Sequence, residues 1–302
     1  MPPAPADSRV VRWLRREGDF VDAGEPLVEV MGGAGSLALA APAAGTLAGV
    51  LRRAGATAAP GSVLGLLAPL PEGGTQVLPL SPTRQAIAQH MVYSVRTSPH
   101  VTVVTEVDVT RLVALRQLHK EAFAHQHGAP LTYLPFFMQA TVAGLRRRPV
   151  MNAEVTATGV VFKRYINLGF VVAAPGLVIT PVLRGADRMG LTELALKVRA
   201  LTQRARAGQI SSAEMADCTF TITNPGAQGG HILGTPIIHQ PNVGILSFET
   251  ITKRPVAVGD QVQVRPMMYL SLSFDHRVAD GPDADAFLDE VKARLIEPPL
   301  RW

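Results

Sequence analysis

The residues best suited to chemistry lie near the C-terminal end, in the segment SLSFDHRVADG at residues 271–281. His276 follows an alternating apolar stretch that is typical of a strand, and an Asp-Gly pair comes four residues later, before a helical pattern. A histidine with an ordinary pKa of about 6.5 can take a proton from a thiol or a hydroxyl and return it to a leaving group. The segment predicts a general base at the end of a strand.

Charged side chains surround this histidine, because Asp275 and Arg277 flank His276 and Asp280 follows. The structural alternative is that His276 is a loop histidine that caps the last helix. We favour the catalytic interpretation, because crowding these ions at a strand end lowers stability unless each is paired.

The elements that position this segment follow from apolar periodicity. Helical spacing and strand-like apolar runs alternate irregularly, which predicts an α/β fold: a two-layer sandwich with a mixed sheet. Helices are expected at about 83–97, 109–127, 133–147, 191–207 and 282–296, and strands at 101–109, 160–174, 177–183, 219–223, 242–251 and 267–274.

Composition narrows the function classes. Charged residues make up only 18% of the 302 residues, which argues against long disordered tails. The net charge is +5, but residues 1–80 hold six Lys or Arg against seven Asp or Glu, so the positive excess belongs to the rest of the chain. Cys218 is the single cysteine, which excludes an internal disulfide. His125 and His127 lack a suitably spaced third ligand, so no metal is expected.

The location of the protein is predicted from two absences. The start of the chain lacks the apolar run of a signal peptide, and no stretch approaches the about 18 apolar residues of a membrane span. We therefore expect a cytoplasmic protein with no membrane partner.

An internal repeat organises the N-terminal part. The segment LRREG at residues 14–18 recurs 37 residues later as LRRAG at residues 51–55. Short apolar strands and glycine turns predict two halves of a small β-sandwich, with the glycine cluster at 32–35 forming an exposed hairpin tip. A Pro- and Gly-rich stretch follows, so we predict an all-β domain over residues 1–69, a linker over 70–79 and a catalytic domain over 80–302.

SFDHRVADG is similar to the active-site motif of the dihydrolipoamide acyltransferases, the core components of 2-oxo acid dehydrogenase complexes. The resemblance implies a fold like that of chloramphenicol acetyltransferase and a homotrimer with active sites at subunit interfaces, with a cubic assembly of trimers as a further level. It extends in family order over LSPTRQAIAQHMVYSVRTSPHVTVVTEVDVTRL (80–112), PVMNA (149–153), GLVITPVLRGAD (176–187), FTITNPG (220–226), GTPIIHQP (234–241) and ARLIEPP (293–299).

The resemblance also assigns roles to individual residues. It makes His276 the general base and Asp280 the second Asp of the motif, and it makes Thr223 the hydroxyl donor to the oxyanion of the transition state. Such a donor contributes on the order of 3 kcal/mol to catalysis. The alternative for Thr223 is an ordinary threonine of a β-strand.

Four further residues are predicted to support the site. Arg184 and Arg277 are expected to bind CoA, Arg84 is expected to pair with Asp280, and Asp275 is expected to brace the motif. The alternative for Arg184 is a solvated position at the end of a strand, which accounts for an arginine there about as well. The alternative for Arg84 is an exposed position at the start of a helix, which accounts for it nearly as well. The positive charge of residues 81–302 then favours the phosphates of CoA over nucleic acid.

The N-terminal part resembles a lipoyl domain, through EGDFVDAGEPLVEV at residues 17–30 and APAAGTL at residues 41–47. The alignment places Ala34 at the position of the lipoyl lysine, and Lys120 is the only lysine in residues 1–162. No covalent lipoate is therefore expected.

The missing lysine favours one function over two others. The preferred hypothesis is an O-acetyltransferase with acetyl-CoA as co-substrate and a small-molecule or carrier-bound acceptor, similar to the non-lipoylated enzymes of tetronate-type antibiotic biosynthesis. The alternative is the core acyltransferase of a 2-oxo acid dehydrogenase complex, served by lipoyl domains on other chains. The third hypothesis is a catalytically inactive scaffold, and the presence of Thr223, His276 and Asp280 argues against it.

Overall fold

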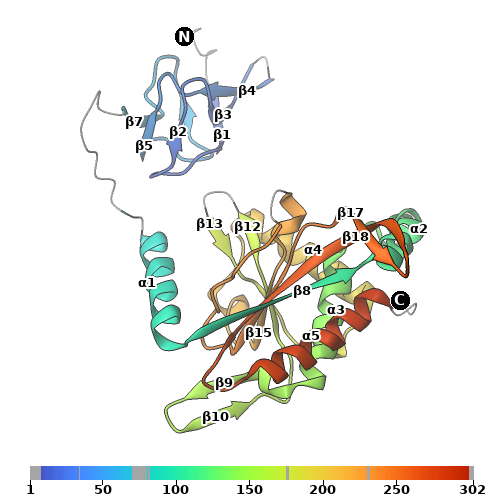
Figure 1. Ribbon diagram of the computed structural model, residues 1–302. Coiled ribbons are helices and arrows are strands. Elements are labelled where there is room, and N and C mark those ends of the chain that lie inside the picture. The colour runs from blue at the N-terminus through green and yellow to red at the C-terminus, as the bar shows by residue number, and fades with distance from the viewer. Residues whose placement is uncertain are drawn as a thin grey trace. The chain divides into compact units, whose positions relative to one another are not determined.

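The structure is a computed structural model in which the chain divides into two compact units, each described here by itself (Figure 1). The predicted linker at 70–79 lies outside the described residues, so the domain boundaries 1–69 and 80–302 stay predictions. The described residues are 8–33, 35–69, 80, 82–174, 177–229 and 232–298, without the side chains of residues 177 and 228.

The N-terminal unit consists of two small sheets with the strand orders β4-β3-β1-β6 and β2-β5-β7. Buried apolar side chains such as Val10, Val28 and Val30 form its core. This arrangement confirms the predicted all-β domain. Its strands are β1 (Ser8–Trp13), β2 (Phe20–Val21), β3 (Pro26–Gly32), β4 (Gly35–Ala40), β5 (Gly45–Val50), β6 (Thr57–Ala58) and β7 (Gly65–Pro69).

The repeat of 37 residues is a structural repeat. Moving β1 along the chain by that number gives β5, and moving β2 gives β6. Gly18 and Gly55 share a φ of +91°, and Gly24 and Gly61 have φ values of +84° and +81°. These turns favour glycine because side chains with a Cβ rarely adopt positive φ. Between the halves, β3 and β4 form the predicted hairpin, while Ala34 at its tip lies outside the described residues.

The described residues from 82 onward contain a mixed seven-stranded sheet and five α-helices. β11, β15 and β16 are parallel neighbours, and β18 pairs antiparallel with β16, β8 and β17. The helices are α1 (Pro82–Thr97), α2 (Thr110–His127), α3 (Leu134–Arg147), α4 (Leu191–Arg206) and α5 (Gly281–Ile296). The strands are β8 (His100–Asp108), β9 (Ala153–Thr156), β10 (Gly159–Phe162), β11 (Leu168–Phe170), β12 (Val172–Ala174), β13 (Leu177–Ile179), β14 (Val182–Leu183), β15 (Phe220–Thr223), β16 (Gly244–Phe248), β17 (Thr252–Val258) and β18 (Gln261–Asp275).

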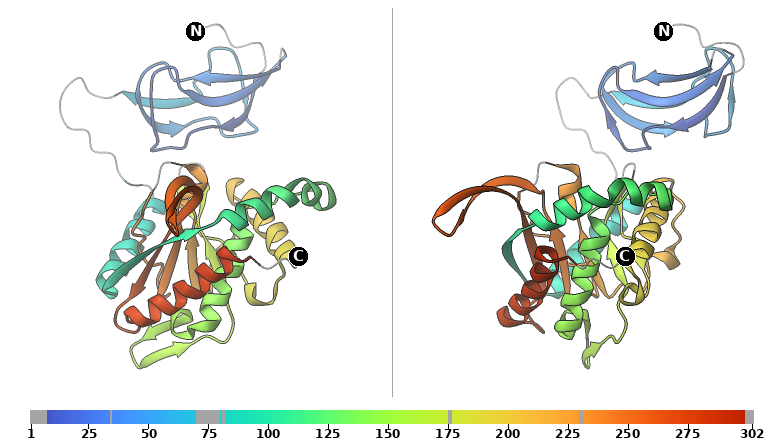
Figure 2. Two further views of the ribbon diagram at one scale, coloured as in Figure 1. Left: turned by 45° about the vertical axis from the view of Figure 1, so that its right-hand side comes forward. Right: turned by 90° about the vertical axis from the view of Figure 1, so that its right-hand side faces the viewer.

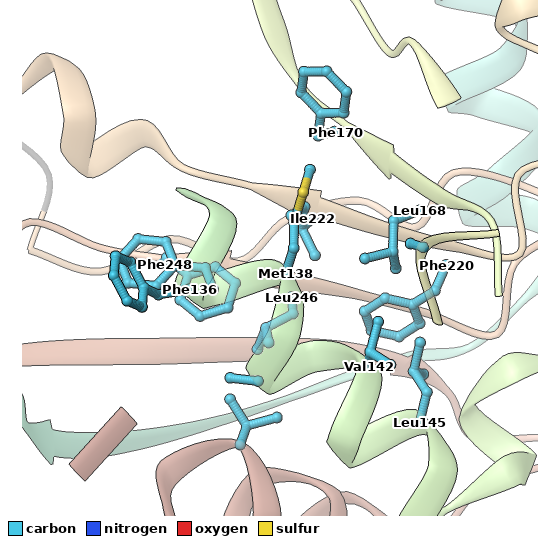
Figure 3. Close-up of a cluster of buried hydrophobic side chains, with 14 of the residues drawn as sticks. Phe136, Met138, Val142, Leu145, Leu168, Phe170, Phe220, Ile222, Leu246 and Phe248 are labelled. Atoms are coloured by element: carbon cyan, nitrogen blue, oxygen red, sulfur yellow. The ribbon is translucent and has the colours of Figure 1, made fainter. Parts of the chain in front are cut away.

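The two faces of this sheet differ in chemistry. One face carries apolar side chains that pack against α3 and α5, as with Phe137 and Phe248, whose rings stack 4.2 Å apart. Figure 3 shows part of this cluster, including Phe248 and Leu246 of β16. The other face carries buried hydroxyls, among them Ser271 and Ser273 of β18. This two-layer arrangement confirms the predicted fold class.

Several strand predictions were wrong: the run at 177–183 forms two strands, the last strand begins at Gln261 instead of residue 267, and β9 was not predicted. The run at 160–174 is not one strand, because the Asn152 side chain donates hydrogen bonds to the carbonyls of Lys163 and Tyr165 and holds the chain in a bend between β10 and β11. β17 was not predicted at all, and it pairs with the first half of β18 in a ribbon that extends away from the sheet (Figure 2). Among the described residues, no helix has the length and apolar character needed to cross a membrane.

Candidate active site

His276 begins the turn that joins β18 to α5. Its backbone N–H donates a hydrogen bond of 3.0 Å to the carbonyl of Pro99, and its Nδ1 lies 3.5 Å from Oδ1 of Asp280. Asp280 is the N-cap of α5, and its backbone N–H donates to the carboxylate of Asp283 over 3.3 Å. The side chain of His276 is 45% exposed, so it is accessible to a substrate.

A buried ion pair holds this turn. Asp275 is 1% exposed, and both of its oxygens accept hydrogen bonds from Arg277, with Nε to Oδ1 at 3.0 Å and Nη2 to Oδ2 at 2.6 Å. This pairing raises the pKa of Arg277. The contacts suit the predicted bracing role of Asp275, which nonetheless stays a prediction. The predicted contact of Arg277 with CoA also stays a prediction, and its guanidinium is already engaged within the turn.

Thr223 lies at the other end of the strands. It pairs in parallel register with Ser247 of β16, which pairs with Ser271 of β18. His276 is five residues beyond Ser271, which is about 17 Å along an extended chain. Thr223 and His276 of one chain therefore cannot contact the same reacting atoms.

The remaining predicted residues are placed as follows. Arg184 follows β14 and donates to the Asp217 carboxylate at 3.2 Å and to the carbonyls of Ala213 and Ala216, so it braces the loop before β15. Arg84 lies exposed in α1, and its predicted pairing with Asp280 stays a prediction.

A buried carboxyl group near Thr223 was missed. Glu249 directly follows β16, is 2% exposed, and accepts a hydrogen bond of 3.3 Å from the Ser271 hydroxyl. Its other oxygen has no hydrogen-bond partner within the described parts of the chain. Glu249 comes two residues after Ser247, which pairs with Thr223. Because side chains two residues apart point to the same face of a sheet, Glu249 shares the hydroxyl-lined face with Thr223. The only sequence signal was the alternation of Ser247 and Glu249 along a predicted strand.

Comparison with known proteins assigns the chain to a family. Residues 72–302 match the family of 2-oxoacid dehydrogenases acyltransferase (catalytic domain), and residues 2–67 match the family named Biotin-requiring enzyme, which groups biotinyl and lipoyl domains. The chain belongs to the 2-oxoacid dehydrogenase acyltransferases.

Individual relatives are consistent with this assignment. The chain is 38% identical over 220 residues to the dihydrolipoyllysine-residue succinyltransferase component of the 2-oxoglutarate dehydrogenase complex of Rickettsia bellii, covering 73% of this chain and 54% of that protein. It thus spans about half the length of the curated relatives it matches.

Solved structures agree. A probable dihydrolipoamide acetyltransferase of Listeria monocytogenes superimposes with a TM-score of 0.73 at 35% identity, over 76% of this chain and 99% of that one. The cubic core of a pyruvate dehydrogenase multienzyme complex superimposes with a TM-score of 0.71 at 32% identity, over 77% and 97%.

These matches correct the preferred function. The predicted O-acetylation of a tetronate-type intermediate is wrong, and with it the small-molecule acceptor, the role in antibiotic biosynthesis and the specific assignment of acetyl-CoA. The relatives are acyltransferase components of 2-oxoacid dehydrogenase complexes. The error came from treating the absence of one lysine as a change of reaction, although the catalytic segment was the more informative feature.

The expected absence of covalent lipoate is also corrected. The match over residues 2–67 makes the N-terminal unit a lipoyl-type domain. Domains of this family type point to covalently bound lipoate as part of the reaction. The hairpin between β3 and β4 nevertheless offers no lysine amine to form the amide, and the first lysine of the chain is Lys120. The residues at this tip do not fit covalently attached lipoate.

Proposed function

We propose that the chain is the core acyltransferase of a 2-oxoacid dehydrogenase complex, which transfers an acyl group from a thioester to the thiol of CoA. The curated relatives suggest succinyl as the acyl group. The observation that carries the proposal is the family match over residues 72–302, in which His276 stands accessible at a strand end with Asp280 beside its Nδ1. Since residues 1–119 contain no lysine, the acyl group is delivered by lipoyl domains on other chains.

The chemistry is a single displacement. Nε2 of His276 removes the proton of the CoA thiol, and the thiolate attacks the carbonyl carbon of the acyl thioester. The Thr223 hydroxyl donates a hydrogen bond to the oxyanion that forms. The bond between the carbonyl carbon and the departing sulfur then breaks, and protonated His276 returns the proton to that sulfur. Asp280 Oδ1, 3.5 Å from Nδ1, lies where it can orient the imidazole ring during transfer.

Two copies of the chain are required for this site, because Thr223 and His276 of one chain lie at opposite ends of the strands. A homotrimer in which each interface joins the Thr223 end of one subunit to the His276 end of the next satisfies the geometry. The similarity to the core of a pyruvate dehydrogenase complex supports such an assembly and a cubic arrangement of trimers.

The test is formation of acyl-CoA from CoA and S-succinyldihydrolipoamide, with the free amide used as the substrate in solution. We expect His276→Ala to lower kcat by about 10² to 10⁴, the contribution typical of a positioned acid-base group. His125→Ala, on the exposed side of α2, is the matched control and should leave kcat unchanged. Absence of transfer by the wild-type chain with succinyl and acetyl thioesters would contradict the proposal, as would full activity of His276→Ala.

A further inference from the structure

The loop before β16 is fixed to α1 and β8 by a set of buried polar contacts. The Ser94 hydroxyl donates to the carbonyl of Ile238 at 2.5 Å, and the Ile238 N–H donates to Nε2 of His100 at 3.0 Å. The Gln240 amide donates to the Ser98 hydroxyl at 2.8 Å. We call these five residues, Ser94, Ser98, His100, Ile238 and Gln240, the polar clamp.

The clamp requires one form of the His100 ring. Nδ1 lies 2.7 Å from the carbonyl of Ser98, which only accepts, so Nδ1 carries a proton. Nε2 receives the Ile238 N–H and must present its lone pair. His100 is therefore neutral, with its proton on Nδ1. Ser94, Ser98 and Ile238 are at most 2% exposed, so water does not replace these bonds when one is lost.

The same segments hold the backbone of the catalytic turn. The N–H of His276 donates to the carbonyl of Pro99, the residue before His100. The N–H of Asp275 donates to the carbonyl of Val243 at 2.8 Å, at the end of the loop that the clamp fixes. His100 is also the partner of Asp275 in the register of β8 and β18. The two backbone amides that place His276 thus depend on the segments on either side of the clamp.

The side chain of His276 has few contacts of its own to fix it. Its ring lies 5.8 Å from the ring of Phe274 and 3.5 Å from an oxygen of Asp280, which is itself 74% exposed. The backbone of the turn therefore sets the point from which the ring extends, and with it the region that Nε2 can reach. A displacement of about 1 Å in a reacting group can lower a rate by about 10²-fold.

We propose that His100 is a positioning residue for His276: through its bond to Ile238 it fixes the loop and the strand end that orient the general base. This inference rests on the proposed acyltransferase function. The contact joins residues 138 positions apart, and it acts through the backbone without touching a substrate.

Two substitutions separate the two bonds of the ring. In His100→Gln the amide oxygen can take the place of Nε2 and accept the Ile238 N–H, whereas in His100→Asn the amide nitrogen can replace only Nδ1 and its bond to Ser98. We expect kcat for acyl transfer to fall about tenfold or more in His100→Asn and less than about threefold in His100→Gln, with KM for CoA changed less than about twofold in both. His125→Asn, on the exposed side of α2, is the matched control.

A second measurement does not depend on turnover. Exchange of the C2 hydrogens of histidines is carried out on the full chain across pH, and mass spectrometry of the proteolytic peptide that contains His276 then reports the titration of His276 by itself. We expect the His276 profile to shift in His100→Asn and to stay as in the wild type in His100→Gln and His125→Asn. Equal kcat in both His100 variants, or an unchanged His276 profile in His100→Asn, would overturn the proposal. If the wild type transferred no acyl group, the proposed function would fail, and the exchange profiles would still decide the role of His100.

Discussion

At the scale of single residues, the catalytic turn depends on one buried carboxylate with one partner. Asp275 is almost fully buried, and Arg277 satisfies both of its oxygens. We expect Arg277→Ala to lower the free energy of unfolding by about 2 kcal/mol, because the carboxylate stays buried without a counter-ion while the arginine itself is partly exposed. Urea unfolding measures this change. Arg294→Ala, which removes an exposed pair with Glu290, should change it by less than about 1 kcal/mol, and equal losses would contradict the expectation.

Some contacts among the predicted site residues could be inferred from the sequence because they are local. His276 and Asp280 are four residues apart between a strand and a helix, and the structure places their side chains 3.5 Å apart. Other relations depend on tertiary contacts. Arg184 pairs with Asp217, 33 residues away, and the burial of Glu249 depends on how neighbouring strands and loops cover the sheet. Such partners have no local signal in the chain.

At the scale of elements, the helices agree with prediction to within about one residue, because apolar spacing and caps are local signals. α2 ends at His127 because Gly128 adopts a left-handed conformation, with a φ of +61°. Strands were predicted less well. β17 contains Pro255 and has only exposed or half-buried side chains, so it lacks the apolar run by which a strand is found. Its existence depends on pairing with β18.

The contact between α3 and α5 leads to a prediction at this scale. A Cβ on Gly144 would lie 2.8 Å from carbons of Phe287 and Val291, so the two helices approach closely at this glycine. Figure 1 shows α3 and α5 side by side. We expect Gly144→Ala to destabilise the fold by about 1 to 3 kcal/mol, although alanine is the better helix former. Thermal unfolding gives the Tm. Adding Phe287→Leu should restore part of the loss, whereas a higher Tm in Gly144→Ala alone would refute the close approach.

The packing of α1 against the loop before β16 makes stability depend on pH. Burial, with a smaller contribution from the charge of His90, lowers the pKa of His239 to about 4, and burial also lowers the pKa of His90. In the unfolded chain these groups take up protons near pH 6.5. The stabilisation is therefore complete above pH 6.5 and is lost as the pH falls from there through about 4.

The variant His239→Asn tests this dependence. It cannot take up a proton at this position, so its Tm should fall less than that of the wild type between pH 7.5 and pH 5, and the remaining fall should reflect His90 and the carboxylates. Parallel pH profiles of the two proteins would show that His239 does not titrate on unfolding.

At the scale of the whole molecule, the sheet separates the two proposed catalytic groups. Thr223 lies where β15 ends, and His276 lies at the opposite end of β18, so the proposed site needs two copies of the chain. Mixed assemblies of two inactive variants test this requirement. When His276→Ala and Thr223→Ala chains are co-expressed, some interfaces join an intact Thr223 from one variant to an intact His276 from the other.

In a closed ring with head-to-tail contacts, random mixing of equal amounts of the two variants gives both intact residues at about a quarter of the subunit interfaces. We therefore expect co-expression to restore about a quarter of wild-type acyl-CoA formation, far above either variant alone. His276→Ala mixed with Asp280→Ala is the matched control. These residues are 3.5 Å apart at the same end of the strands, so every interface stays defective and activity should not exceed that of Asp280→Ala alone. The absence of recovery with the Thr223 pair would place both groups in a site within one chain and contradict the register of the sheet. Recovery with the control pair would mean that His276 and Asp280 act from different chains, against their contact within one chain.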